Sequence, residues 1–110
     1  MKPDYTYKAK LVRVIDGDTV DLLVDLGHRI TIKERYRLSG INTPEVRGKE
    51  REAGLAAKRF LMWELREDLV IQTDLDKKGK YGRYLATLYV DGRNINQALV
   101  DAGHAVVEHY

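Results

Sequence analysis

The sequence predicts a mainly β fold with helices (α+β), in the form of a small five-stranded Greek-key barrel with two helices. Three observations carry this prediction. Apolar and polar residues alternate through much of the first forty residues, which is the pattern of strands with one buried face. From about residue 50 the apolar residues recur every three or four positions, which is the pattern of a helix. Two more strand patterns and a second helix pattern follow.

The first three strands are expected to form a meander. Residues 11–15 give the first strand. The second strand has alternating apolar residues, which are Val20, Leu22, Val24 and Leu26. Gly27 then marks a turn, and the third strand is expected over residues 30–38.

The next segment predicts a helix over residues 50–66, since its apolar residues form one stripe: Ala53, Ala56, Ala57, Phe60 and Leu61. We place Phe60 and Trp63 in the core beside this stripe. Strands are expected over residues 69–73 and 84–90. The second helix should begin after Asn94 as its N-cap and end near Gly103.

Length and composition limit the class of protein. With 110 residues the chain is long enough for a single domain, spanning residues 1–110. No apolar run approaches the twenty residues that a membrane helix needs, so we expect no membrane partner. The first residues lack the apolar stretch of a secretory signal, which favours a cytoplasmic location and leaves secretion of a processed form open. Without cysteines, disulfides and thiolate zinc sites are excluded.

The charge distribution suits a polyanionic ligand. The formal net charge is only +2, but residues 29–83 hold fourteen Lys and Arg against nine Asp and Glu. This segment therefore carries +5, while the two ends of the chain are acidic. Ordinary solvated faces explain the same distribution, so charge alone decides nothing.

Two short polar segments follow strands and could carry chemistry. Residues 16–19, Asp-Gly-Asp-Thr, join the first two strands, and the glycine lets a tight turn present neighbouring carboxylates together. Residues 42–45, Asn-Thr-Pro-Glu, follow the third strand, where the proline keeps Thr43 extended. Taken alone, each segment reads as an ordinary turn or loop. Arg37 and Arg83 lie on strands near them.

Together these segments resemble the staphylococcal nuclease family. The resemblance rests on Asp-Gly-Asp-Thr-Val at residues 16–20, Arg-Leu at 37–38 with Asn-Thr-Pro-Glu at 42–45, and Lys-Tyr-Gly-Arg at 80–83. It extends from about Lys8 to about Val107 and implies the OB-fold form of the barrel. The type member of the family has a further C-terminal helix beyond the position of Tyr110, which this sequence lacks.

The resemblance also implies a set of site residues and a chemistry. It implies a Ca²⁺ site formed by the side chains of Asp18 and Asn42 and the backbone carbonyl of Thr43. The implied catalytic residues are Glu45, which activates or orients the attacking water, and two phosphate-binding arginines, Arg37 and Arg83. Lys80 and Tyr81 would line the substrate groove. The expected protein is a monomeric, calcium-dependent nuclease that cleaves single-stranded DNA or RNA with little sequence preference.

Elementary chemistry agrees with these roles. Calcium takes oxygen ligands from carboxylates, carbonyls and water, so a site without histidine or thiol suits it. Negative charge accumulates on the phosphoryl oxygens during cleavage, and a planar guanidinium can bind two of these oxygens at once. Glu45 would serve as a general base.

One position departs from the family pattern. The family usually has aspartate where this chain has Asn42, so the site keeps an oxygen ligand and loses one negative charge. We therefore expect weak calcium binding. The alternative function is a catalytically weak or inactive OB-fold module that binds single-stranded nucleic acid or protein. The basic segment 46–51 fits a phosphate-binding loop and a solvated helix entry equally well.

Overall fold

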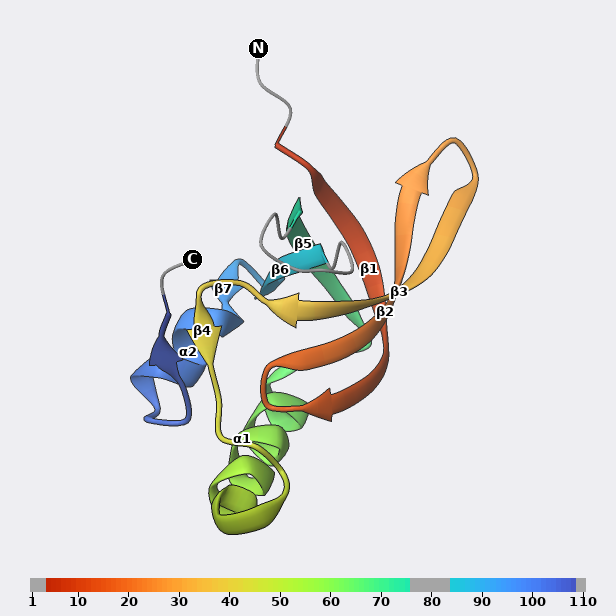
Figure 1. Cartoon of the computed structure of the whole chain (residues 1–110). Coiled ribbons are helices and arrows are strands. Elements are labelled where there is room, and N and C mark those ends of the chain that lie inside the picture. The colour runs from red at the N-terminus through yellow and green to blue at the C-terminus, as the bar shows by residue number, and fades with distance from the viewer. Residues whose placement is uncertain (1–3, 76–83, 109–110) are drawn as a thin grey trace.

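The computed structural model describes residues 4–75 and 84–108, with the side chain of Leu75 left out. Within these residues five strands close into a barrel (Figure 1): β1 (Thr6–Asp16), β2 (Thr19–Gly27), β3 (Ile30–Leu38), β5 (Asp68–Leu75) and β6 (Tyr84–Val90). Their order is β3-β2-β1-β5-β6, and a parallel pairing of β3 with β6 closes the ring. The predicted α+β fold with a five-stranded OB-type barrel is confirmed.

Three strands of two residues each were not predicted. β4 (Ile41–Asn42) pairs with β8 (Val106–Val107), and β7 (Arg93–Asn94) pairs with β6. Two residues cannot show a period, so hydrophobic patterning gives no signal for such strands. The β4–β8 pairing brings the chain after α2 next to Asn42.

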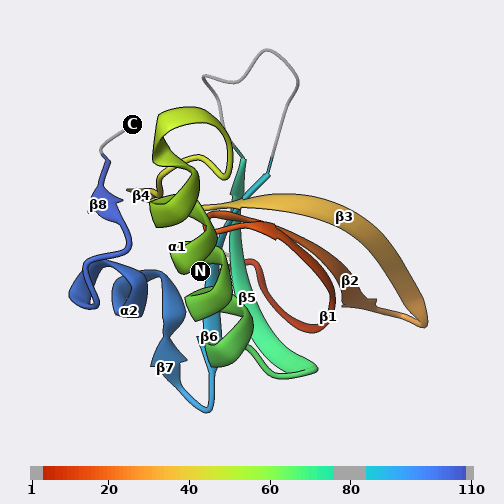
Figure 2. The same ribbon diagram turned by 90° about the horizontal axis from the view of Figure 1, so that it is seen from below.

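Two α-helices cover the barrel, as predicted. A short 3₁₀ turn, η1 (Gly48–Glu50), leads into α1 (Arg51–Glu64), and α2 is Ile95–Asp101. In Figure 1 α1 lies below the barrel with α2 to its side, and Figure 2 shows α1 in front of the barrel. No helix in the described part of the chain is long and apolar enough to cross a membrane.

The expected caps of α2 are confirmed. The Asn94 side chain accepts a hydrogen bond from the backbone N–H of Gln97 at 3.0 Å, which satisfies one of the free donors at the helix start. After the helix, Gly103 has φ +82°, a left-handed conformation that glycine adopts without strain.

The core fills the barrel and the space between the barrel and both helices. Its largest fully buried side chains come from all of these elements: Leu22, Leu38, Leu61, Ile71, Leu88, Ile95 and Leu99. Phe60 packs partly buried against this core, as predicted. Trp63 does not, since 80% of its surface is exposed. It lies two residues after buried Leu61, which is a rotation of about 200° around a helix, so it faces away from the barrel.

Candidate active site

The turn between β1 and β2 holds two carboxylates in a fixed arrangement. The backbone N–H of Asp18 donates to Asp16 Oδ1 at 3.1 Å, and the Thr19 hydroxyl donates to Asp18 Oδ1 at 3.2 Å. Asp18 is buried, with 7% of its surface exposed. The prediction that this turn brings neighbouring carboxylates together is confirmed.

Asp16 belongs to the same cluster, although the sequence reasoning gave it no role. Burial raises the pKa of the Asp16 carboxyl above its ordinary value, and the neighbouring Asp18 side chain raises it further, whereas the hydrogen bond from the Asp18 backbone N–H lowers it. Two carboxylates this close repel each other when both are ionised. A cation bound beside them would therefore be stabilised.

Gly17 is required at this turn for its small size. A Cβ atom at residue 17 would lie 2.7 Å from the Ala57 Cβ and 2.8 Å from the Thr43 Oγ1. The turn is thus pressed against α1 and against the segment after β4. Sequence reasoning attributed the glycine to backbone freedom, but its φ is not positive, and the close contacts explain it instead.

Thr43 is held next to Asp18. Its backbone N–H donates to Asp18 Oδ2 at 3.2 Å, and the residue is buried. Its hydroxyl oxygen is also buried and has no hydrogen-bond partner among the described residues. Buried polar atoms are rarely left in this state, so the Thr43 side chain lies where a further polar group can be accommodated.

Arg37 connects the predicted site residues to one another. Its Nη1 lies 3.7 Å from Asp18 Oδ2, and its Nη2 donates to Asn42 Oδ1 at 3.1 Å and to the Ile41 carbonyl at 3.3 Å. The Arg37 side chain is only 18% exposed, whereas buried Tyr36 and Leu38 point to the opposite face of β3. Three predicted residues, from the β1–β2 turn, β3 and β4, are therefore brought together.

A further carboxylate reaches Arg37 from the end of the chain. Glu108 Oε2 lies 3.4 Å from Arg37 Nη2, and the pairing of β4 with β8 positions it there. Sequence reasoning missed Glu108, because seventy-one positions separate the two residues and β8 is too short to predict. A phosphate that binds Arg37 must share this guanidinium with Glu108 or displace it.

Glu45 lies on a loop whose backbone is fixed and whose side chain is exposed. Its N–H donates to Glu50 Oε2 at 3.1 Å. Its carbonyl packs directly on α1 at Gly54, where a Cβ atom would lie 2.1 Å from the Glu45 oxygen. Among residues 4–75 and 84–108, no hydrogen bond or ion pair restrains the Glu45 carboxylate.

The contact between Glu45 and Gly54 gives a prediction about stability. Helix propensity alone favours Gly54→Ala by about 1 kcal/mol. The packing predicts the opposite, because the added methyl group would meet backbone atoms that cannot move aside cheaply. We expect Gly54→Ala to lower the free energy of unfolding by about 1–3 kcal/mol, measured by urea denaturation. Ala53→Ser, at an exposed neighbouring position, is the control. A more stable Gly54→Ala variant would contradict the structure.

The remaining predicted residues are not placed. Lys80, Tyr81 and Arg83 lie outside the described residues. Within the described residues no group of three or more His, Cys, Asp or Glu side chains could hold a metal ion. A metal bound here would depend on a mixed set of oxygens: the carboxylates of Asp16 and Asp18, the Asn42 amide and the backbone around Thr43.

One cavity in the described region adjoins the site, and two larger ones lie elsewhere on the barrel. The cavity beside the site, of about 230 Å³, is lined by residues that include Asn42, Thr43, Pro44, Glu50 and His104. Its volume suits a chemical group of a ligand better than a whole nucleotide. A larger groove of about 990 Å³ runs over β1, β2 and β5, and no predicted site residue lines it.

Comparisons with known proteins find one matching family and several relatives. The family described as staphylococcal nuclease homologue matches residues 35–110. The thermonuclease of Staphylococcus hyicus is 31% identical over 97% of this chain and 62% of its own length. An uncharacterised protein of Methanocaldococcus jannaschii is 32% identical over 92% of this chain and 59% of its own length. Protein ParB of Escherichia coli is 36% identical over 89% of this chain and 55% of its own length. The chain thus spans less than two thirds of each of these relatives.

Proposed function

The chain belongs to the staphylococcal nuclease family, and from this membership we propose that it is a calcium-dependent phosphodiesterase that hydrolyses DNA or RNA with little sequence preference. The observation that carries the proposal is the network around Arg37. This guanidinium contacts Asp18 and Asn42, while the Thr43 N–H donates to the same Asp18 carboxylate. The groups proposed to bind the cation and the phosphate thus lie within one small cluster.

The donors in this cluster fit a calcium ion. Asp18, Asn42 and Thr43 would hold it, and Asp16 adds a second carboxylate beside Asp18. The unsatisfied Thr43 hydroxyl and the raised pKa of the Asp16 carboxyl both favour an additional cation here. Calcium prefers such oxygen ligands. Bound there, Ca²⁺ would offset negative charge on the phosphate and favour deprotonation of the attacking water.

The other residues would act on the phosphate and on the water. Arg37 would bind a phosphoryl oxygen and stabilise the charge that develops on it, with Arg83 as the proposed second phosphate ligand. Glu45 would accept a proton from the attacking water or hold that water in line. Its exposed, unrestrained carboxylate is compatible with such a role, since a base must reach the solvent from which the water comes. Lys80 and Tyr81 are proposed to line the substrate groove.

Two observations favour the second candidate, a module that binds nucleic acid or protein without cleaving it. Asn42 contributes no charge to the calcium site, and Glu108 already occupies part of the Arg37 guanidinium. Both features weaken the groups that the reaction needs. Neither feature changes the rest of the barrel surface, where a nucleic acid or a protein could still bind.

Asn42→Asp separates the two candidates. The new carboxylate adds one negative charge, so calcium binding should tighten by about 1 kcal/mol, the scale of one charge pair in solvent. Calcium titrations followed by calorimetry and by cleavage of single-stranded DNA measure this effect, with Asn94→Asp, at the N-cap of α2, as the charge-matched control. Activity at limiting calcium should rise with affinity. Tighter binding without cleavage in either protein would favour the module, and unchanged affinity would remove residue 42 from the ligands.

A further inference from the structure

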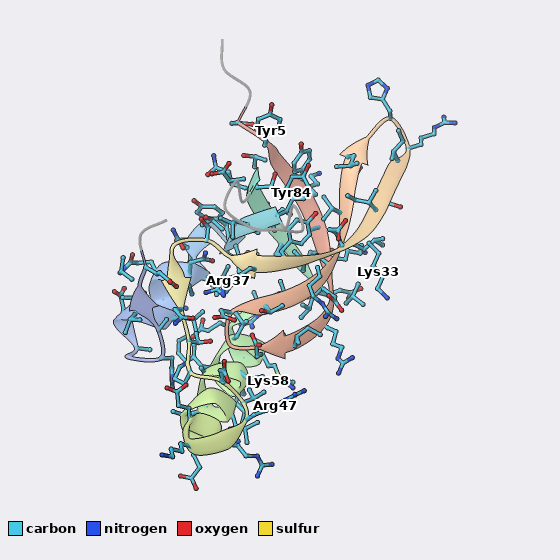
Figure 3. All side chains as sticks on the ribbon, viewed as in Figure 1. Tyr5, Lys33, Arg37, Arg47, Lys58 and Tyr84 are labelled. Carbon is cyan, nitrogen blue, oxygen red and sulfur yellow. The ribbon has the colours of Figure 1, made fainter. Side chains whose placement is uncertain are left out.

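The outer face of β3 carries a row of cations that ends at the candidate site. Lys33, Arg35 and Arg37 occupy alternate positions, and the pairing of β3 with β2 runs without a break from Thr31 to Arg37. Alternate residues of a strand project on the same side, about 6.7 Å apart. Figure 3 shows Lys33 and Arg37 on the same side of the β3 ribbon. The row therefore leads along one face to Arg37.

Neighbouring strands add to this row. Asp21 on β2 is the register partner of both Arg13 on β1 and Arg35 on β3. The Arg35 guanidinium donates two hydrogen bonds to the Asp21 carboxylate, from Nε at 2.9 Å and from Nη2 at 3.3 Å. Arg13, Lys33 and Arg35 are all exposed, and we call these three residues the basic patch. They surround a single carboxylate, so the patch keeps a net charge of about +2.

Electrostatic effects link the basic patch to its surroundings. The hydrogen-bonded Arg35 lowers the pKa of the Asp21 carboxyl, and the charges of Arg35, Lys33 and Arg13 lower it further. Asp21 is thus kept ionised and fixes the Arg35 guanidinium. The hydrogen bond and charge of Asp21 raise the pKa of Arg35, and the charge of Asp16 at the site contributes in the same direction. The basic patch adjoins the site through Arg35 and Arg37, which occupy alternate positions on β3.

We propose that the basic patch binds the phosphates of a nucleic-acid strand that runs along the outer face of β3 to Arg37. This inference rests on the proposed function and identifies its substrate as a polymer several nucleotides long. The row of cations matches a backbone that carries one charge per nucleotide, and contacts to phosphates carry no sequence information. Asp21 uses Nε and Nη2 of Arg35, and within residues 4–75 and 84–108 nothing is bonded to its Nη1, which can therefore bind a phosphate. A strand held in this way would bind without sequence preference.

Binding measured without catalysis tests the proposal. The probe is a fluorescent single-stranded oligothymidylate in excess chelator, and its anisotropy is titrated at several salt concentrations. The test variant is Arg13→Gln with Lys33→Gln, which leaves the Arg35–Asp21 pair intact. The control is Arg59→Gln with Arg66→Gln, two exposed residues on α1 and just after it. For single strands each lost phosphate contact lowers the slope of log K against log salt by about 0.7.

We expect the patch variant to lose about 1.4 in this slope and the α1 control to keep the parental slope. An unchanged slope in the patch variant would overturn the proposal. An equal loss in the control would overturn it too, because net charge alone would then explain binding. If the parent cleaves DNA, the patch variant should raise KM for the oligomer and not for a dinucleotide. Specific loss of binding in a protein that never cleaves would support the basic patch and reject the nuclease.

Discussion

Glu45→Gln is expected to lower kcat on single-stranded DNA by about 100- to 10,000-fold, the usual contribution of a general base. Glutamine has nearly the same shape as glutamate but cannot accept a proton from water at neutral pH. The Glu45 side chain is exposed and makes no hydrogen bond within the described residues, whereas its backbone N–H and carbonyl fix the loop. The substitution should therefore remove chemistry and leave the free energy of unfolding unchanged.

Initial rates at saturating calcium measure this effect, and thermal denaturation checks the fold. Glu52→Gln is the matched control, since Glu52 is an exposed carboxylate in the first turn of α1 and has no proposed role. Its kcat should equal that of the parent. A folded Glu45→Gln variant that cleaves at the parental rate would show that this carboxylate is not the base. Loss of activity in both variants would show that activity depends on the net negative charge of this region and not on Glu45 itself.

The fold was predictable because its main elements obey simple periods. The alternation of Val20, Leu22 and Val24 places all three in the core, and each is fully buried. The failures had more than one cause. Leu26 continues the alternation of β2 but is 38% exposed, and Ala53 belongs to the expected stripe of α1 but is exposed as well. Strands of two residues have no period, and Trp63 was assigned to the core for its size although its position on α1 faces solvent.

Part of the site was also predictable, because local sequence motifs specify it. Asp18, Arg37, Asn42 and Thr43 meet as expected, since each lies at or next to the end of a strand in the same region of the barrel. Glu108 could not be found from sequence, because its contact depends on the β4–β8 pairing.

The basic patch could not be predicted from the sequence either. The sequence shows the excess of positive charge in residues 29–83 but not where these charges lie on the surface. Arg13 lies outside that segment, and only the pairing of β1 with β2 and of β2 with β3 places it near Arg35. Charge counts describe a chain, whereas a binding surface depends on which strands are neighbours.

Removal of calcium tests the central claim most directly. The parent protein is incubated with single-stranded DNA in roughly millimolar calcium, the range expected for a site of low charge, then in excess chelator, and then with calcium restored. We expect cleavage in calcium, complete loss of cleavage in chelator, and renewed cleavage when calcium is restored. Circular dichroism should show a folded protein in all three conditions. The reason is that Asp16, Asp18 and Asn42 supply oxygens but no positive charge to balance the phosphate and the attacking water. Undiminished cleavage in excess chelator would contradict the account.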